Sequence, residues 1–207
     1  MENKYKKCKI TYSLILICLI VYLYSFIKYG ETMSAWEAYE LGAFNPLFVE
    51  WSREYWRFIT SNFIHFGIIH LACNCYSLQG IGCFLEQTFK SKHYLIIIMS
   101  SAICTNLLGY IAFLINGYGA NTMSGGISGV IFGLLGAIVV IAYQYKGIYE
   151  RIYRSLLPNI ILMFLISFLA SGISLSGHIG GFIGGMLATA LVVNHIEKNK
   201  KETLYHH

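Results

Sequence analysis

The sequence predicts an all-α polytopic membrane protein, folded as a bundle of six transmembrane helices. Of its 207 residues, 56% are hydrophobic and only 12% are charged, and the mean hydropathy is +0.57. Soluble domains typically contain about 25% charged residues, so this chain is too apolar to be one. Its charges also lie between apolar runs of about 18 to 25 residues, the length with which a helix crosses roughly 30 Å of hydrocarbon.

The expected spans follow one another with polar segments between them. The first apolar run has tyrosines and no small-residue cleavage site, so it predicts a membrane helix rather than a cleaved signal peptide. The aromatic segment after it suits the membrane–water interface. Gly67 is the expected break before the second span, and Pro158 is expected near the start of the fifth, where proline disrupts a helix least. The spans are predicted over residues 10–27, 68–88, 94–115, 127–145, 156–170 and 176–194, with an outward loop over residues 28–67.

The basic residues predict the orientation in the membrane. Six spans place both termini on one side, and Lys and Arg accumulate in cytoplasmic segments. All 15 Lys and Arg residues except Lys28, Arg53 and Arg57 fall on the side of the termini, which are therefore expected in the cytoplasm. Because these residues flank spans rather than form one patch, no nucleic-acid partner is expected. Residues 1–207 are predicted to form one membrane domain, and the sequence leaves open whether His206 and His207 are native.

The six cysteines predict neither a disulfide framework nor a metal site. Each lies in an apolar run or in the basic N-terminal tail. Cys73 and Cys75 are two residues apart, so on a helix they point in different directions. The metalloprotease motif H-E-x-x-H does not occur in the chain. We therefore expect no metal and no other cofactor.

Four polar side chains inside the expected spans are candidate functional residues, because polar groups in hydrocarbon are costly. They are His70, Asn74, Ser128 and His178. The predicted topology brings His70, Ser128 and His178 to the outward ends of the second, fourth and sixth spans. Asn74 lies one turn deeper than His70 on the same helix face.

Glycine repeats predict that the fourth and sixth spans approach each other closely. The repeat of Gly125, Gly129 and Gly133 matches that of Gly177, Gly181 and Gly185. Ser128 and His178 each neighbour such a glycine, so the imidazole can serve as general base for the hydroxyl. The first turn of a helix also favours a developing anion at Ser128. The alternative is that the glycines only pack helices and that both polar side chains are structural.

In combination, these motifs resemble the rhomboid family of intramembrane serine proteases over nearly the whole chain. The resemblance rests on six spans, Trp56-Arg57 in a long outward loop, and three sequences: HFGIIHLACN from His65, GISG around Ser128, and GHIGGFIGG around His178. It implies Ser128 as nucleophile and His178 as general base. It also implies that His70, Asn74 and the Ser128 amide hold the oxyanion. The residues that it implies as structural support are His65, Glu86, Trp56, Arg57, Gly126, Gly129, Phe132 and Gly181.

The chain departs from the family pattern at a few positions. Phe132 stands where relatives often have tyrosine; its ring can stack on the imidazole but offers no hydroxyl. Lys90 stands where a glycine is common after the family's glutamate, which Glu86 matches. Gly177 replaces the alanine that commonly precedes the histidine. We expect these differences to affect packing and stability more than chemistry.

The expected function is that of a serine endopeptidase that cleaves transmembrane-helix substrates near the outward face of the bilayer. The chain contains no aspartate, which excludes a Ser-His-Asp triad and leaves a Ser-His dyad. It also excludes an intramembrane aspartyl protease. The more serious alternative is a small transporter or channel, whose pathway His and Asn would line. A catalytically inactive protein that binds membrane helices would be expected to have lost Ser128 or His178, and both are present.

The expected partners are single-span membrane proteins and the lipid bilayer. The sequence gives no extra domain or transit peptide, which favours a bacterial cytoplasmic membrane. It does not predict the oligomeric state, the natural substrate or the preferred cleavage site.

Overall fold

The computed structural model describes residues 8–169 and 174–205, which form helices joined by short loops. Within these residues the sole β feature is an isolated bridge between Phe44 and Ser124. The predicted all-α class is therefore confirmed. His206 and His207 lie outside the described residues, as does most of the expected loop between the fifth and sixth spans.

The long helices match the predicted spans in order. They are α1 (Lys9–Tyr29), α5 (Ile68–Ser77) continued by the π-helical turn η3 (Leu78–Gly82) and α6 (Cys83–Thr88), α7 (Ser91–Asn116), α8 (Ser128–Gln144), α9 (Ile148–Leu169) and α10 (Leu175–Tyr205). Among the described residues, four segments are long and apolar enough to cross a membrane: 9–29, 68–88, 91–116 and 175–199. Helix α8 is apolar but has 17 residues. Six crossings therefore stay a prediction.

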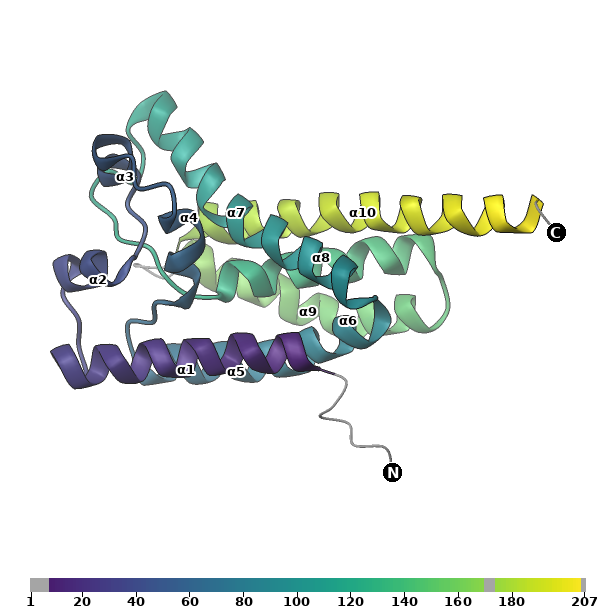
Figure 1. Cartoon of the computed structure of the whole chain (residues 1–207), viewed down its shortest axis with the longest axis horizontal. Coiled ribbons are helices and arrows are strands. Elements are labelled where there is room, and N and C mark those ends of the chain that lie inside the picture. Colours follow the sequence, from purple (N-terminus) through teal and green to yellow (C-terminus); the bar gives the residue numbers. More distant parts are fainter. Residues whose placement is uncertain (1–7, 170–173, 206–207) are drawn as a thin grey trace.

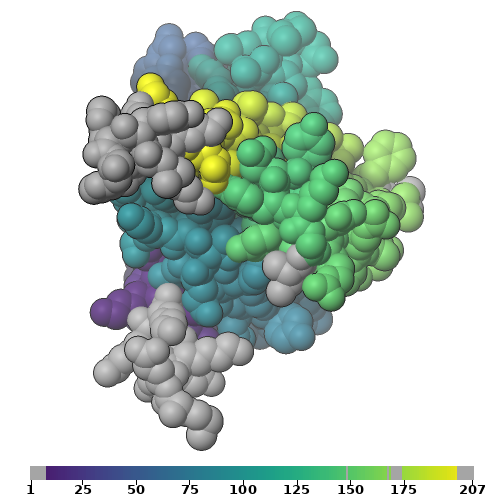
Figure 2. All heavy atoms as spheres, turned by 90° about the vertical axis from the view of Figure 1, so that its right-hand side faces the viewer, coloured from purple at the N-terminus to yellow at the C-terminus, as the bar shows by residue number. Residues whose placement is uncertain are grey.

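Helix α8 forms the centre of the bundle. Twelve of its 17 residues are buried, glycines among them, because α7, α9 and α10 pack around it. Helices α1 and α5 run side by side along one edge of the molecule (Figure 1). Helix α1 begins and α10 ends at the same end of the bundle, which faces the viewer in Figure 2. Helix α8 begins toward the opposite end, near the small helices of the outward loop.

The expected position of Pro158 in its helix was wrong. Pro158 lies inside α9 rather than near its start. The helix begins about two turns earlier, where an ion pair of 2.7 Å between Arg154 and Glu150, four residues apart, supports helical structure in a polar segment. Helix α10 continues past residue 194 to Tyr205, because the Glu- and Lys-containing sequence after the apolar run favours helix.

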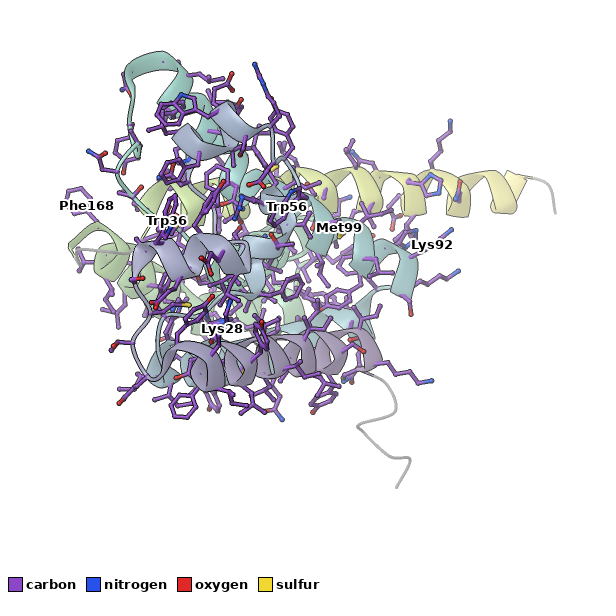
Figure 3. The ribbon with its side chains drawn as sticks, turned by 60° about the vertical axis from the view of Figure 1, so that its left-hand side comes forward. Lys28, Trp36, Trp56, Lys92, Met99 and Phe168 are labelled. Carbon is purple, nitrogen blue, oxygen red and sulfur yellow. The ribbon has the colours of Figure 1, made fainter. Side chains whose placement is uncertain are left out.

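The outward loop folds into three short helices and a 3₁₀ turn. These are α2 (Ala35–Leu41), α3 (Pro46–Ser52), α4 (Arg57–Thr60) and η2 (Ser61–Phe63). Ser34 and Glu37 form a capping box at the start of α2, and Asn45 caps α3 ahead of Pro46. Figure 3 shows Trp36 toward the end of the molecule that carries Phe168, whereas Lys92 lies toward the other end.

Arg57 holds this loop together. Its buried guanidinium donates to Glu54 at 2.7 Å and to the backbone carbonyls of Tyr39 and Ala43. It also stacks over the rings of Tyr39, at 3.6 Å, and Trp56, at 4.4 Å. The Tyr39 hydroxyl and the Arg57 guanidinium hold the pKa of Glu54 below its ordinary value, because both hydrogen-bond the ionised carboxylate. Arg57 thus joins α2 to the start of α4.

Glu86 of α6 caps the N-terminus of α1. The helix has no side-chain cap of its own at Cys8. Instead, the Glu86 carboxylate accepts hydrogen bonds from the Ile10 amide at 2.9 Å, the Thr11 amide at 2.8 Å and the Thr11 hydroxyl at 2.7 Å. A negative charge at this end of a helix also interacts favourably with the helix dipole. One buried carboxylate therefore fixes the first span to the second.

We predict that Glu86→Ala lowers the free energy of unfolding by about 1–3 kcal/mol, because it leaves buried amide donors without partners. Denaturant unfolding in detergent micelles, followed by circular dichroism, measures this loss. Glu31→Ala, at an exposed position, is the matched control and should change little. Equal losses for the two variants would contradict the capping role.

Candidate active site

Ser128 and His178 meet between two helices that are far apart in the sequence. Ser128 is the first residue of α8, and His178 lies in the first turn of α10. The Ser128 Oγ is 2.9 Å from the His178 Nε2, within hydrogen-bonding distance. A nucleophile and a base in this contact form the minimal unit for acyl transfer.

Glycines on both helices allow this approach. A Cβ atom added to Gly181 would overlap the carbonyl oxygen of Gly129, and one added to Gly185 would overlap the backbone of Gly133. The two backbones are therefore in direct contact, as in other small-residue helix interfaces. The predicted repeats are only partly correct, since Gly125 faces Ile64 and Gly177 faces Ser174.

Phe132 orients the His178 ring. The phenyl and imidazole rings stack with centroids 4.1 Å apart and planes 15° apart. Both side chains are buried, so the stack also keeps water from one face of the imidazole. Phe132 also makes a T-shaped contact with Phe164 of α9, with centroids 4.6 Å apart. The stack of Phe132 on His178 restricts the rotation of the imidazole ring.

His70 and Asn74 lie against the backbone that leads into Ser128. Gly126 adopts a φ of +119°, which side-chain-bearing residues rarely adopt. A Cβ atom there would be 2.8 Å from Cε1 of His70 and 3.5 Å from Nδ2 of Asn74. Glycine is thus required both for the backbone conformation and for space. The structure brings all four polar candidates to one place.

His65 positions Asn74. The Asn74 amide donates to Nε2 of His65 at 3.0 Å, and Nδ1 of His65 then donates to the Phe63 carbonyl at 3.1 Å. This pairing assigns the neutral tautomer with its proton on Nδ1. Burial, together with the neighbouring His70, lowers the pKa of His65 to about 4, so the ring stays neutral at pH 7. The His65 ring also contacts the ring of His70, with centroids 5.0 Å apart.

Several buried polar residues that support the site were not predicted. Asn106 of α7 donates to the Ser61 hydroxyl at 2.8 Å, and the Ser61 carbonyl accepts from the Gly126 amide at 2.9 Å. Asn45 donates to the carbonyls of Ala120 and Thr122 in the loop before Ser128. These bonds tie the outward loop to the segment that carries Gly126. The sequence could have indicated a structural role for Asn45, because an asparagine directly before a proline is typical of the start of a helix.

We predict that Gly181→Ala lowers the free energy of unfolding by about 1–3 kcal/mol, because the added methyl group forces α10 away from α8. Gly109→Ala is the matched control: it also lies within a long helix, but its added Cβ would make only an ordinary contact with Ser176. Denaturant unfolding in micelles compares the two. Equal stability of both variants would contradict a close contact of the backbones.

Comparisons with known proteins identify the family of this chain. The family model of the rhomboid domain matches residues 52–195, about two thirds of the chain. The chain is 32% identical over 96 residues to rhomboid protease GluP of Bacillus subtilis, which covers 46% of this chain and 18% of the relative. It is 29% identical over 129 residues to rhomboid protease GlpG of Salmonella paratyphi A, which covers 62% of this chain and 42% of the relative. The chain thus matches less than half the length of these curated relatives. It belongs to the rhomboid family.

Proposed function

We propose that the protein is an intramembrane serine endopeptidase that works through a Ser128–His178 dyad. The observation that carries this proposal is the 2.9 Å contact between the hydroxyl of Ser128 and the imidazole of His178. The relatives named rhomboid proteases support the same reaction class. A purely structural hydrogen bond would not need a helix N-terminus and two further polar side chains directed at the same place.

In the proposed reaction, Ser128 Oγ attacks the carbonyl carbon of a peptide bond while His178 Nε2 takes the hydroxyl proton. The imidazolium then gives that proton to the leaving amine, and an acyl-enzyme remains on Ser128. Water deprotonated by His178 hydrolyses the ester and restores the hydroxyl. Phe132 keeps the ring in position through both proton transfers.

The oxyanion of the tetrahedral intermediate is placed at the N-terminus of α8. The Ser128 amide points out of the first turn of a 17-residue helix, where the dipole favours negative charge. His70 and Asn74, which lie beside Gly126, are the side-chain donors. Donors fixed in advance around a developing charge are the largest single contribution in many enzymes of this kind.

The proposed topology has both termini in the cytoplasm and the dyad near the outward face. Helix α1 begins and α10 ends at one end of the molecule, and the loop helices lie near the other (Figure 1). Lys92 near the first end, and the exposed Lys198 in the C-terminal part of α10, suit a cytoplasmic surface. One membrane domain in a bacterial cytoplasmic membrane, acting on single-span membrane proteins, is the arrangement that we propose.

We predict that Ser128→Ala and His178→Ala each abolish cleavage of a single-span substrate in liposomes. The first removes the nucleophile and the second the base, and together they should lose no more activity than either alone. Cleavage is followed by mass spectrometry of the products, with His195→Ala, a histidine further along α10, as the matched control. Cleavage by Ser128→Ala at the rate of the native chain would contradict the assignment.

We predict that His70→Ala and Asn74→Ala each lower turnover by on the order of 10²- to 10³-fold, because each removes an oxyanion donor. These two variants should therefore keep some activity, whereas the Ser128→Ala and His178→Ala variants should keep none. Asn116→Ala, at the end of α7, is the control for Asn74→Ala. Circular dichroism first checks that each variant is folded, since Asn74 also hydrogen-bonds His65. Full activity of both folded variants would refute the oxyanion role.

A further inference from the structure

Asn106 is a buried polar residue of α7, the helix against which α4 packs (Figure 1). Its partner Ser61, at the start of η2, is buried as well. Polar side chains inside a membrane bundle are costly and usually serve a function. Neither residue belongs to the dyad or to the oxyanion donors, so their function must act through other groups.

The amide of Asn106 holds the loop at two points that are three residues apart. Its Nδ2 donates to the carbonyl of Phe58 at 3.0 Å and to the hydroxyl of Ser61 at 2.8 Å. An asparagine side chain has two N–H donors, and this pairing uses both. A single bond would let the 3₁₀ turn rotate about it, whereas two bonds fix its orientation. The direction of the Ser61 carbonyl is therefore set from α7.

The carbonyl of Ser61 in turn holds the segment that leads into the nucleophile. It accepts a hydrogen bond from the Gly126 amide at 2.9 Å. The other attachments of this segment to the outward loop, through Asn45 and through a backbone pair, end at Ser124 or earlier. The bond to Ser61 lies only two residues before Ser128. It is thus the attachment best placed to fix the start of α8.

Gly126 is also the residue against which the proposed oxyanion donors lie. Its φ is +119°, and a Cβ atom on it would be 2.8 Å from Cε1 of His70 and 3.5 Å from Nδ2 of Asn74. A rotation of the peptide at Gly126 would change the distances between these side chains and the Ser128 amide. Donors stabilise a developing charge best when their geometry is fixed in advance. A small displacement of Gly126 should therefore raise the energy of the transition state more than it weakens substrate binding.

We propose that Asn106 is a positioning residue for the reaction. Through Ser61 it holds the Gly126 amide, and thereby keeps the oxyanion donors in their productive arrangement. The inference rests on the proposed protease function. It adds to that function a residue of α7, a helix that supplies neither member of the dyad, and it predicts an effect on turnover without an effect on substrate binding.

Asn62 is the matched control for Asn106. It is also a buried asparagine that joins the 3₁₀ turn to α7. Its amide donates to three backbone carbonyls, those of Phe58, Ile59 and Ala102. Within the part of the chain that the structure describes, its hydrogen bonds include neither the Ser61 side chain nor Gly126. Asn62→Leu thus removes a comparable attachment of the loop but leaves the bonds from Asn106 to Gly126 intact.

The first test measures kcat and KM for a single-span substrate in liposomes. Asn106→Leu keeps the size of the side chain and should lower kcat about 10- to 100-fold, since a misplacement of about 1 Å can cost about 10²-fold. Its KM should stay within about twofold of the native value, because only transition-state stabilisation is lost. Ser61→Ala should act similarly, and the double variant should lose no more than the stronger single one, because both changes break one series of bonds. Asn62→Leu should keep the native kcat.

Ser61→Ala is the smaller change and provides the test if Asn106→Leu does not fold. A native kcat in the folded variants, or a higher KM with an unchanged kcat, would overturn the inference. An equal fall of kcat in Asn62→Leu would also overturn it, since any loosening of the loop would then have the same effect.

If the native protein cleaves no substrate, the proposed function fails, and hydrogen exchange decides the positioning separately. The Gly126 amide, resolved by mass spectrometry of fragmented peptides, should exchange at least about tenfold faster in Asn106→Leu and Ser61→Ala than in the native protein, because a bonded amide exchanges only when its bond opens. Asn62→Leu should exchange at the native rate. Equal exchange rates in all four proteins would overturn the inference.

Discussion

The contact between the backbones of α8 and α10 is the constraint on which the rest of this structure depends. Gly129 and Gly133 on one helix and Gly181 and Gly185 on the other leave no room for a Cβ atom at the crossing. In a membrane, such a contact gains its stability from packing rather than from burial of apolar surface, since lipid is as apolar as leucine. The dyad lies one turn from this crossing, so a hydrogen bond of 2.9 Å across two helices follows from the glycine geometry.

The outer parts of the fold protect this geometry with buried polar groups. Arg57 organises the outward loop, and Glu86 fixes α1 to α6 from the other end of the bundle. Between them, Asn106 and Ser61 connect α7 to the amide of Gly126. Each of these side chains hydrogen-bonds buried donors or acceptors. In a low-dielectric interior, a buried polar group without a partner costs considerable free energy. Among its polar residues, the protein therefore has two groups: those proposed to react at or beside Ser128, and those that support them.

The sequence identified the residues of the proposed reactive group more completely than those of the supporting group. Ser128, His178, His70 and Asn74 were detectable because polar residues are rare in apolar runs and because the topology brings their spans to one side. Pro158 was expected near the start of its helix but lies inside α9. The expected start followed the apolar run of the fifth span, and the polar segment before that run, which is also helical, carries no apolar pattern. Gly125 and Gly177 were assigned to the crossing by spacing alone, but a four-residue repeat does not specify which helix a glycine faces. The partners of Glu86 are 75 residues or more away in the chain, and no local pattern predicts such a pairing.

The central claim is that the hydroxyl of Ser128 and the imidazole of His178 act as one reactive unit. The most direct measurement is the labelling of the native protein in micelles with a fluorophosphonate, followed by mass spectrometry of the modified peptide. The account predicts one adduct per chain, on Ser128, formed at a rate that falls sharply in His178→Ala. An unlabelled Ser128, or a His178→Ala variant labelled as fast as the native protein, would contradict it.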